Sequence, residues 1–282
     1  MVGDFLKPLS EPVVKLIDSI SGAVGALYEP TRVRRRADAD ADAAIILAKG
    51  QTEVDDIQFR AGERLLRREI RRQRNIESIV ETAKQSLPDS VSDDPVAEDW
   101  IYDFFEQCHD VSNEQMQGLW AQILAGEVTR PRSFALHTLA LVKTLAPYDA
   151  ERFTIFCERV WIIDRIPVPI YFFPHTVKQR AKQKLTFDDL LDLESIGLIR
   201  ISEIGFSMSF VENPYSAFYQ EQSYLVTVPE IQPGTLDDGN VVLTPAGKEL
   251  MSIIDCQPDE EFKNSTLELW RSRGWEVVET SE

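Results

Sequence analysis

The chain has 282 residues, 43% of them apolar, and a formal net charge of −17. This apolar fraction can form a buried core, which excludes a wholly disordered protein. Neither a run of 18 apolar residues nor the pattern of a signal peptide is present, so we expect a cytoplasmic protein without a membrane-spanning helix.

Residues 1–30 are predicted to be an apolar leader, whose helix begins near Pro12. Apolar side chains recur in it at three- and four-residue steps and form one stripe. Two interpretations of this stripe are open. It packs on the body or on a partner subunit, or it lies on the inner-membrane surface, because the basic segment RVRRR follows at once. The stripe consists of Val13, Leu16, Ile17, Ile20, Val24 and Leu27.

Residues 31–87 are predicted to form a long charged helical arm. Residues 31–84 carry a net charge of +3, whereas the rest of the chain carries −20, so an anionic partner would meet the arm. A thin apolar seam predicts that the arm packs in an oligomer and pairs with the acidic body. The seam consists of Ile57, Ala61, Leu65, Ile70, Ile76, Ile79, Val80 and Ala83.

Seven arginines of the arm are the candidate residues for binding an anionic partner. They are Arg60, Arg64, Arg67, Arg68, Arg71, Arg72 and Arg74. Contact with a nucleic-acid backbone is the alternative, because arginine suits phosphate groups. No aromatic residues alternate with these arginines for base stacking, so such binding would not be specific. The charge of the body argues against specific nucleic-acid recognition as well.

Residues 96–165 are predicted to be an antiparallel helical bundle. One core helix begins at a capping box of Ser112 and Gln115, and a third helix is expected over AERFTIFCERVWII, residues 150–163. Other predicted helix boundaries are Gly126 as a stop, Ser133 as an N-cap and Pro147 as a terminator.

Residues 185–282 are predicted to be a winged-helix-like α+β unit. A short helix, a turn at Gly197 and a strand are followed by two strand candidates, FSMSF and SYLVTV, and by a helix capped by Thr244. Winged helices commonly bind DNA, but the would-be recognition helix, residues 187–196, has four acidic and no basic residues. We therefore interpret this unit as a protein-contact or structural element.

Nothing in the sequence predicts a catalytic residue, a metal site or a cofactor. The phosphate-loop, dinucleotide, zinc-protease and serine-hydrolase motifs are missing. Cys108, Cys157 and Cys256 lie far apart, which favours reduced, mostly buried thiols over a disulfide scaffold or a zinc site. An enzyme acting on nucleotides or nucleic acid is an alternative, because clusters of carboxylates cannot be recognised from sequence spacing.

Three stretches suggest a family: RRQRNIESIVETA (71–83), GLWAQILAGEVTRPRSFALHTLALVKTLAPYDAERF (118–153) and LLDLESIGLI to VVLTPAGKEL (190–250). In this order they resemble a bacterial family of unknown function that is similar to the abortive-infection alpha proteins. The resemblance implies a role in bacterial defence against phage and transfers no catalytic residue. Its positions are Leu119, Trp120, Ala121, Leu124, Ala125, Pro131, Ser133, Phe134, Leu145, Pro147, Ala150, Leu193, Gly197, Leu198, Ile199, Leu243, Thr244 and Gly247.

The expected protein is thus mostly α, with a leader, an arm, a helical bundle and a winged-helix-like unit. We expect a non-enzymatic antiviral-defence or regulatory protein that acts as a homo-oligomer. Its expected contacts are a partner protein of a defence system or the inner-membrane surface. A DNA-binding winged-helix regulator is the alternative, and the nucleic-acid or nucleotide enzyme is a second one.

Overall fold

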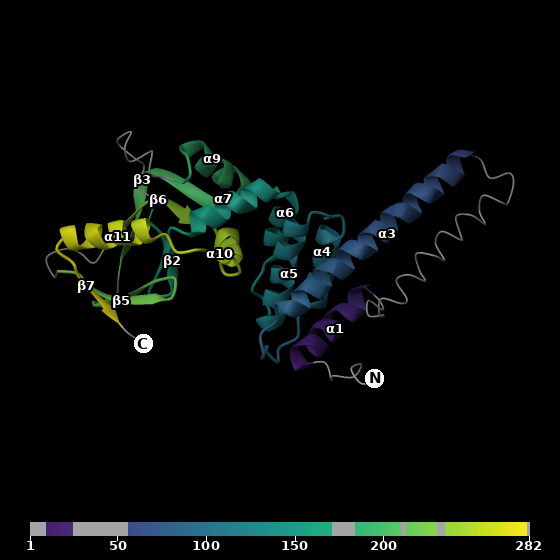
Figure 1. Ribbon diagram of the computed structural model, residues 1–282, viewed down its shortest axis with the longest axis horizontal. Coiled ribbons are helices and arrows are strands. Elements are labelled where there is room, and N and C mark those ends of the chain that lie inside the picture. Colours follow the sequence, from purple (N-terminus) through teal and green to yellow (C-terminus); the bar gives the residue numbers. More distant parts are fainter. Residues whose placement is uncertain (1–9, 25–55, 171–183, 210–212, 230–234, 281–282) are drawn as a thin grey trace, which may run out of the picture. The chain divides into compact units, whose positions relative to one another are not determined.

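The computed structural model describes residues 10–24, 56–170, 184–209, 213–229 and 235–280. The chain divides into two compact units, residues 1–143 and 144–282. Helices predominate over strands among these residues, so the fold is mostly α (Figure 1). None of the described helices combines the length and the hydropathy that crossing a membrane requires.

The described part of the first unit is helical. Its elements are α1 (Glu11–Val24), α3 (Asp56–Gln85), α4 (Glu98–Cys108), α5 (Glu114–Thr129) and α6 (Leu136–Thr144), the last of which ends at the unit boundary. Helix α3 packs on α5 and α4, and α1 packs on α4 and α5 (Figure 1). Within the predicted arm, residues 56–85 are helical, and residues 31–55 lie outside the described part of the chain.

Aromatic side chains form the centre of this unit. The rings of Phe104 and Trp120 meet edge to face with their centroids 5.3 Å apart, and both side chains are fully buried. Trp100 stacks on Phe104 at 5.2 Å and donates its indole N–H to the Phe134 carbonyl oxygen at 2.7 Å. Such ring pairs bury much apolar surface at defined angles, so they fix how α4 lies on α5.

Some predicted helix caps of the bundle are wrong. Helix α5 is capped by Asn113, whose side chain accepts from the Met116 N–H at 3.0 Å, while the Ser112 hydroxyl contacts Asn75 of α3. The helix also continues past Gly126 to Thr129. A glycine inside a helix weakens it without ending it, and here tertiary packing decides the boundary.

The turn before α6 is held by a buried carboxylate and not by Ser133. Glu127 accepts from the backbone N–H groups of Arg132, Ser133 and Phe134 at 2.6, 2.9 and 3.0 Å. Arg132 adopts a φ of 71°, which brings these three donors round one side chain. Pro147 then begins the next helix instead of ending α6, because its missing N–H suits a first helical position.

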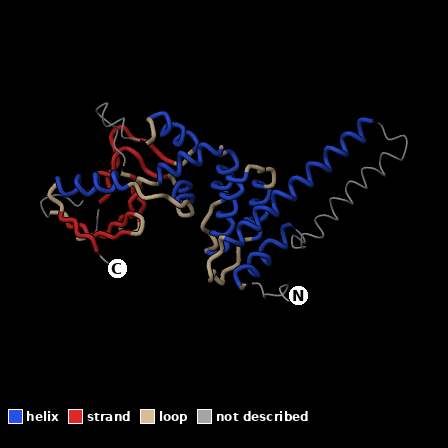
Figure 2. The backbone as a smooth tube through the Cα atoms, in the orientation of Figure 1, coloured by secondary structure: helices blue, strands red, loops and turns tan. Residues whose placement is uncertain are grey.

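The second unit combines helices with two antiparallel sheets (Figure 2). Its elements are α7 (Pro147–Cys157), β1 (Val160–Ile163), β2 (Ile166–Pro169), α9 (Phe187–Ile196), β3 (Ile199–Ser209), β4 (Tyr215–Tyr219), β5 (Gln222–Thr227), β6 (Thr235–Leu243), α10 (Pro245–Met251), α11 (Glu260–Ser272) and β7 (Glu276–Thr280). The five-stranded sheet has the order β2-β1-β4-β5-β7, and β3 pairs with β6.

The predicted helix over residues 150–163 is wrong after Cys157. Residues 160–163, VWII, form strand β1, which pairs with β2 on one side and β4 on the other. β-branched and aromatic side chains favour a strand, and a turn at Asp164 and Arg165, both with positive φ, folds β2 back onto β1. The segment predicted as one helical bundle, 96–165, thus contains strands and spans the unit boundary.

Helix α11 packs on the five-stranded sheet through large aromatic side chains. The rings of Trp161 in β1 and Trp270 in α11 lie 4.7 Å apart, and both residues are fully buried. Tyr219 and Tyr224 contact Trp161 from β4 and β5. This core joins residues on both sides of the predicted boundary of the winged-helix-like unit at residue 185.

Two helix boundaries predicted for the winged-helix-like unit are found, but the predicted strands pair differently. Gly197 ends α9 with a φ of 96°, and the Thr244 side chain caps α10, as predicted. The two strand candidates do not pair with each other. Residues 206–209 of FSMSF lie in β3, which pairs with β6, and residues 223–227 of SYLVTV lie in β5, which pairs with β4 and β7. Along the chain, strands β4 and β5 of the larger sheet thus lie between β3 and β6, which pair with each other.

Candidate functional site

Helix α3 has two parts with different surroundings. Its C-terminal part contributes Asn75, Ile76, Ile79, Val80 and Ala83 to the buried core. Residues 57–74 contain no buried side chain, and Figure 1 shows this length of α3 extending away from α4 and α5. We call residues 56–74 the basic arm, because seven arginines and three acidic residues give it a net charge of +4.

The predicted apolar seam packs within this chain only at its C-terminal end. Ile76, Ile79, Val80 and Ala83 are buried, whereas Ile57 is 66% and Leu65 is 52% exposed. Periodicity identifies the face of a helix but does not say how far along the helix that face meets a neighbour. The exposed part of the seam accompanies the arginines along the basic arm.

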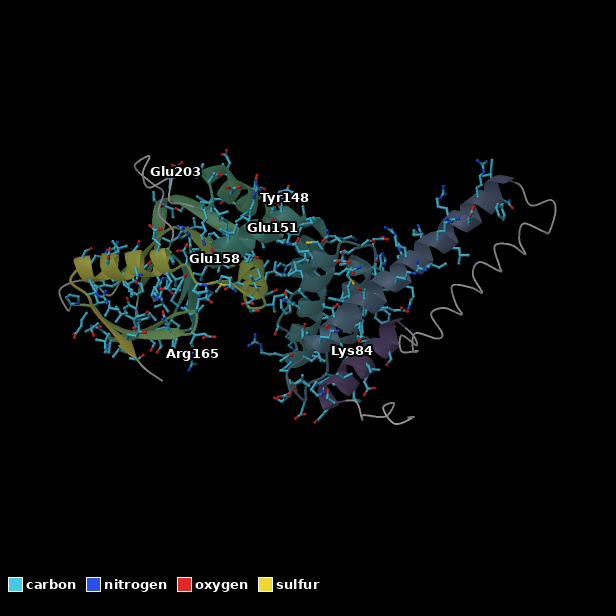
Figure 3. The ribbon with its side chains drawn as sticks, in the orientation of Figure 1. Lys84, Tyr148, Glu151, Glu158, Arg165 and Glu203 are labelled. Atoms are coloured by element: carbon cyan, nitrogen blue, oxygen red, sulfur yellow. The ribbon has the colours of Figure 1, made fainter. Side chains whose placement is uncertain are left out.

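All seven predicted arginines lie on the basic arm, and only Arg72 is partly buried. Some of their charge is compensated within the helix, as in the pair of Arg67 with Glu63 at 2.8 Å. Arg68 lies 3.1 Å from Glu69. Nitrogen-tipped side chains are visible along this length of α3 in Figure 3. Exposed pairs of this kind attract weakly, so the arm keeps its positive potential.

Two of these arginines hold a carboxylate. The Arg72 guanidinium donates to both oxygens of Asp110, with Nη2 to Oδ2 at 2.7 Å and Nε to Oδ1 at 3.1 Å. Arg71 donates to Oδ1 at 2.8 Å, and His109 Nε2 lies 3.3 Å from Oδ2. The hydrogen bond from Arg72 lowers the pKa of Asp110 to about 2. The arm thus recognises a carboxylate in the two-pronged geometry that favours arginine over lysine.

A strongly acidic surface lies in the same unit. Residues 89–114 contain nine acidic residues and neither lysine nor arginine. On α4 and just after it, the exposed carboxylates are those of Glu98, Asp99, Asp103, Glu106 and Asp110. We call these five residues the acidic surface. The overall acidity of the chain does not single out this segment, but a local count of charges along the sequence does.

The described part of the leader packs within its own unit. Leu16 and Ile20 are buried, with 0% and 1% exposure, and α1 contacts α4 and α5. Val13 and Ile17 are partly buried. Val24 is the last residue of α1, and Leu27 lies outside the described residues. These positions support the packing interpretation of the stripe.

Helix α9, the would-be recognition helix, is attached to α7 through its acidic residues. Arg152 of α7 lies 2.8 Å from both Asp189 and Asp192. Phe187 and Asp188 are exposed at the start of α9. The exposed side of this helix is therefore acidic and apolar, and it would repel a DNA backbone.

The structure brings two distant cysteines together, which the sequence analysis did not foresee. Cys157 ends α7 and Cys256 lies between α10 and α11, with its Sγ 3.8 Å from the carbonyl oxygen of Thr154 in the last turn of α7. No group of three metal-binding side chains from His, Cys, Asp and Glu is found among the residues that the structure describes.

Comparison with known proteins gives a family but no function. Residues 59–267 match the model of a family described as "Protein of unknown function (DUF2806)". Neither a curated protein nor a solved structure matches the chain. The family match covers well over half of the chain, including most of α3 and every later helix and strand up to α11. The chain therefore belongs to the family DUF2806, whose members have no assigned function.

Proposed function

We propose that the chain is a non-enzymatic defence or regulatory protein that acts through self-assembly. In this assembly the basic arm of one copy binds the acidic surface of another. The observation that carries the proposal is the contact of Arg71 and Arg72 with Asp110, a member of the acidic surface. It is an example, within one chain, of the chemistry that the contact between copies would repeat.

The dimensions and charges of the two surfaces support this proposal. The 19 residues of the basic arm form a rod of about 28 Å at 1.5 Å per residue. The Arg71 and Arg72 contacts use only its last turn, which leaves several exposed arginines along the rod. Opposite charges on one chain favour association between copies and would steer them into register.

The setting of this assembly is a further part of the proposal. The resemblance to the abortive-infection alpha proteins suggests bacterial defence against phage, and the matched family leaves that role open. The unit formed by α9, β3, β6 and α10 serves in this proposal as a winged-helix-like protein-contact element. The acidic side chains on α9 favour that role over DNA regulation.

Charge reversal in the full-length protein tests the assembly. Arg64→Glu with Arg68→Glu lowers the charge of the arm by four units, and both positions are exposed. We expect the wild type to sediment as an oligomer that dissociates as salt rises, and the double variant to sediment as a monomer. A matched control, Arg200→Glu with Arg271→Glu, makes the same charge change in the second unit and is expected to leave the oligomer intact.

A charge swap separates specific contact from general repulsion. Adding Asp99→Lys and Asp103→Lys to the arm variant gives the acidic surface two lysines that can pair with the two new glutamates of the arm, and we expect the oligomer to return. A wild type that stays monomeric at tens of micromolar, or an arm variant that assembles like the wild type, would overturn the proposal. If the arm variant instead loses binding to an RNA homopolymer, the nucleic-acid alternative gains support.

A further inference from the structure

Cys157 and Cys256 meet where two segments of the second unit are tied together. Cys157 is 1% exposed at the end of α7, and Cys256 is partly exposed between α10 and α11. The Cys256 Sγ lies 3.8 Å from the carbonyl oxygen of Thr154, which is one turn before Cys157 in α7. The neighbouring thiol contributes to the raised pKa of Cys157 and to the lowered pKa of Cys256.

The residues that follow each cysteine hold this meeting point in place. The hydroxyl of Tyr219 donates to the Glu158 carbonyl oxygen at 2.7 Å and accepts from the Asp259 N–H at 2.8 Å. Lys184 joins the same two segments, because its Nζ lies 2.5 Å from Glu158 and 3.4 Å from Asp259. Glu158, labelled in Figure 3, follows Cys157 directly. The chain segments that follow the two cysteines are thus joined by Tyr219 and by Lys184.

We propose that Cys157 and Cys256 form a dithiol site that reacts with hydroperoxides, with Cys256 oxidised first and Cys157 closing a disulfide with it. The site is independent of the proposed self-assembly, because both cysteines belong to the second unit. The substrate class is a small peroxide, and hydrogen peroxide is its simplest member.

The surroundings of the two thiols assign their order of reaction. Cys256 is accessible, and the hydrogen bond from Cys157 lowers its pKa, which favours the thiolate that attacks peroxides. Cys157 is buried, and burial raises its pKa well above the usual range, so it is a poor first nucleophile. Cys108 is likewise buried, with a raised pKa, but it belongs to the first unit. It therefore provides an internal control.

The chemistry takes place in two steps. The Cys256 thiolate attacks one oxygen of hydrogen peroxide, so that an S–O bond forms and the O–O bond breaks. The leaving hydroxide takes a proton and departs as water, which leaves a sulfenic acid on Cys256. The sulfur of Cys157 then attacks that of Cys256, and the S–S bond forms as the S–O bond breaks. The second water carries away the Cys157 proton, so two thiols are oxidised by two electrons and one peroxide is reduced to two waters.

The test uses the full-length protein with a small excess of hydrogen peroxide. Remaining thiols are then alkylated under denaturing conditions, and the peptides are analysed by mass spectrometry. We expect a Cys157–Cys256 cross-linked peptide that dithiothreitol abolishes, with Cys108 fully alkylated. We also expect the oxidised protein to melt several degrees higher, because the cross-link closes a long loop. Oxidation of Cys108 at the same rate as Cys256, or a Cys256 that stays fully alkylated, would refute the site.

Variants resolve the order of the two steps. In Cys157→Ala we expect oxidation to stop at the sulfenic acid of Cys256, which dimedone traps. In Cys256→Ala we expect Cys157 to stay reduced, and in the control Cys108→Ala we expect the cross-link to form as in the wild type. A dimedone adduct on Cys157 in the wild type would reverse the assigned order and so overturn it. The cross-link in the unmodified chain decides the existence of the site even where a variant folds poorly.

Discussion

The carboxylate of Asp110 illustrates how a single residue responds to its neighbours. Its pKa lies near 2, first because of the hydrogen bond from Arg72 and then because of the charges of Arg72, His109 and Arg71, while burial acts in the opposite direction. A pKa below the unfolded value of about 3.9 means that the ionised form stabilises the folded state. This stabilisation is fully present above the unfolded value and is lost as the pH falls towards 2.

We predict that removing Arg72 returns this carboxyl to ordinary behaviour. A carbon-detected NMR titration of Asp110 should give a midpoint near 2 in the wild type and a clearly higher one in Arg72→Gln. The control Arg67→Gln removes a guanidinium that contacts Glu63 and should leave the midpoint unchanged. An unchanged midpoint in Arg72→Gln would show that the two-pronged contact is not formed in solution.

Glu127 is a structural carboxylate that the sequence does not distinguish from the other acidic residues of the chain. It is 2% exposed and accepts from three backbone N–H groups. Glu127→Gln keeps the shape but replaces one acceptor oxygen by a donor, so we predict a loss of about 3 kcal/mol in the free energy of unfolding. Urea unfolding measures it. Glu114→Gln, at an exposed position of the same helix, should lower the free energy of unfolding by only about 0.5 kcal/mol, because it removes one charge from the helix N-terminus.

At the scale of elements, the contact of α10 with the start of β3 depends on one glycine. A Cβ at Gly247 would lie 2.1 Å from the carbonyl oxygen of Leu198, and that oxygen already accepts from Thr244. The colliding atom is backbone and cannot rotate away. We predict that Gly247→Ala destabilises the protein by about 3 kcal/mol, at the upper end of overpacked substitutions.

A matched glycine in another helix provides the control. Gly118 lies inside α5, and a Cβ there would meet nothing within 4 Å. Gly118→Ala should therefore stabilise the protein by about 1 kcal/mol, the difference in helix propensity. Thermal unfolding of both variants should show opposite shifts, and a loss of stability in both would mean that the close approach to Leu198 is not the cause.

Local signals explain which elements the sequence could predict. Thr244 and Pro245 begin α10, and Gly197 ends α9, because each residue acts through its own backbone or side chain. Strand β1 could not be separated from the preceding helix, because its partners β2 and β4 decide its state and β4 lies some fifty residues away. The meeting of Cys157 with Cys256 and of Arg72 with Asp110 depends likewise on tertiary packing, which no spacing reveals.

At the scale of the whole molecule, the predicted four parts become two compact units. The leader and the arm join the first unit because Leu16, Ile20 and the C-terminal part of α3 pack into its core. The winged-helix-like segment joins α7, β1 and β2, because the five-stranded sheet draws strands from both sides of residue 185. Composition and breaks in periodicity indicated linkers, but the packing of distant strands sets the units.

The insertion of β4 and β5 between β3 and β6 has a consequence for the growing polypeptide on the ribosome. Trp161 leaves the ribosome more than a hundred residues before Trp270, which packs on it, and before β7, which completes the five-stranded sheet. At 5–20 residues per second, this interval lasts about 5 to 25 seconds. Throughout it an aromatic surface and open strand edges face the solvent. The second unit thus relies on contacts between residues far apart in the sequence, and such contacts expose apolar surface for longer during synthesis than the local contacts of helices do.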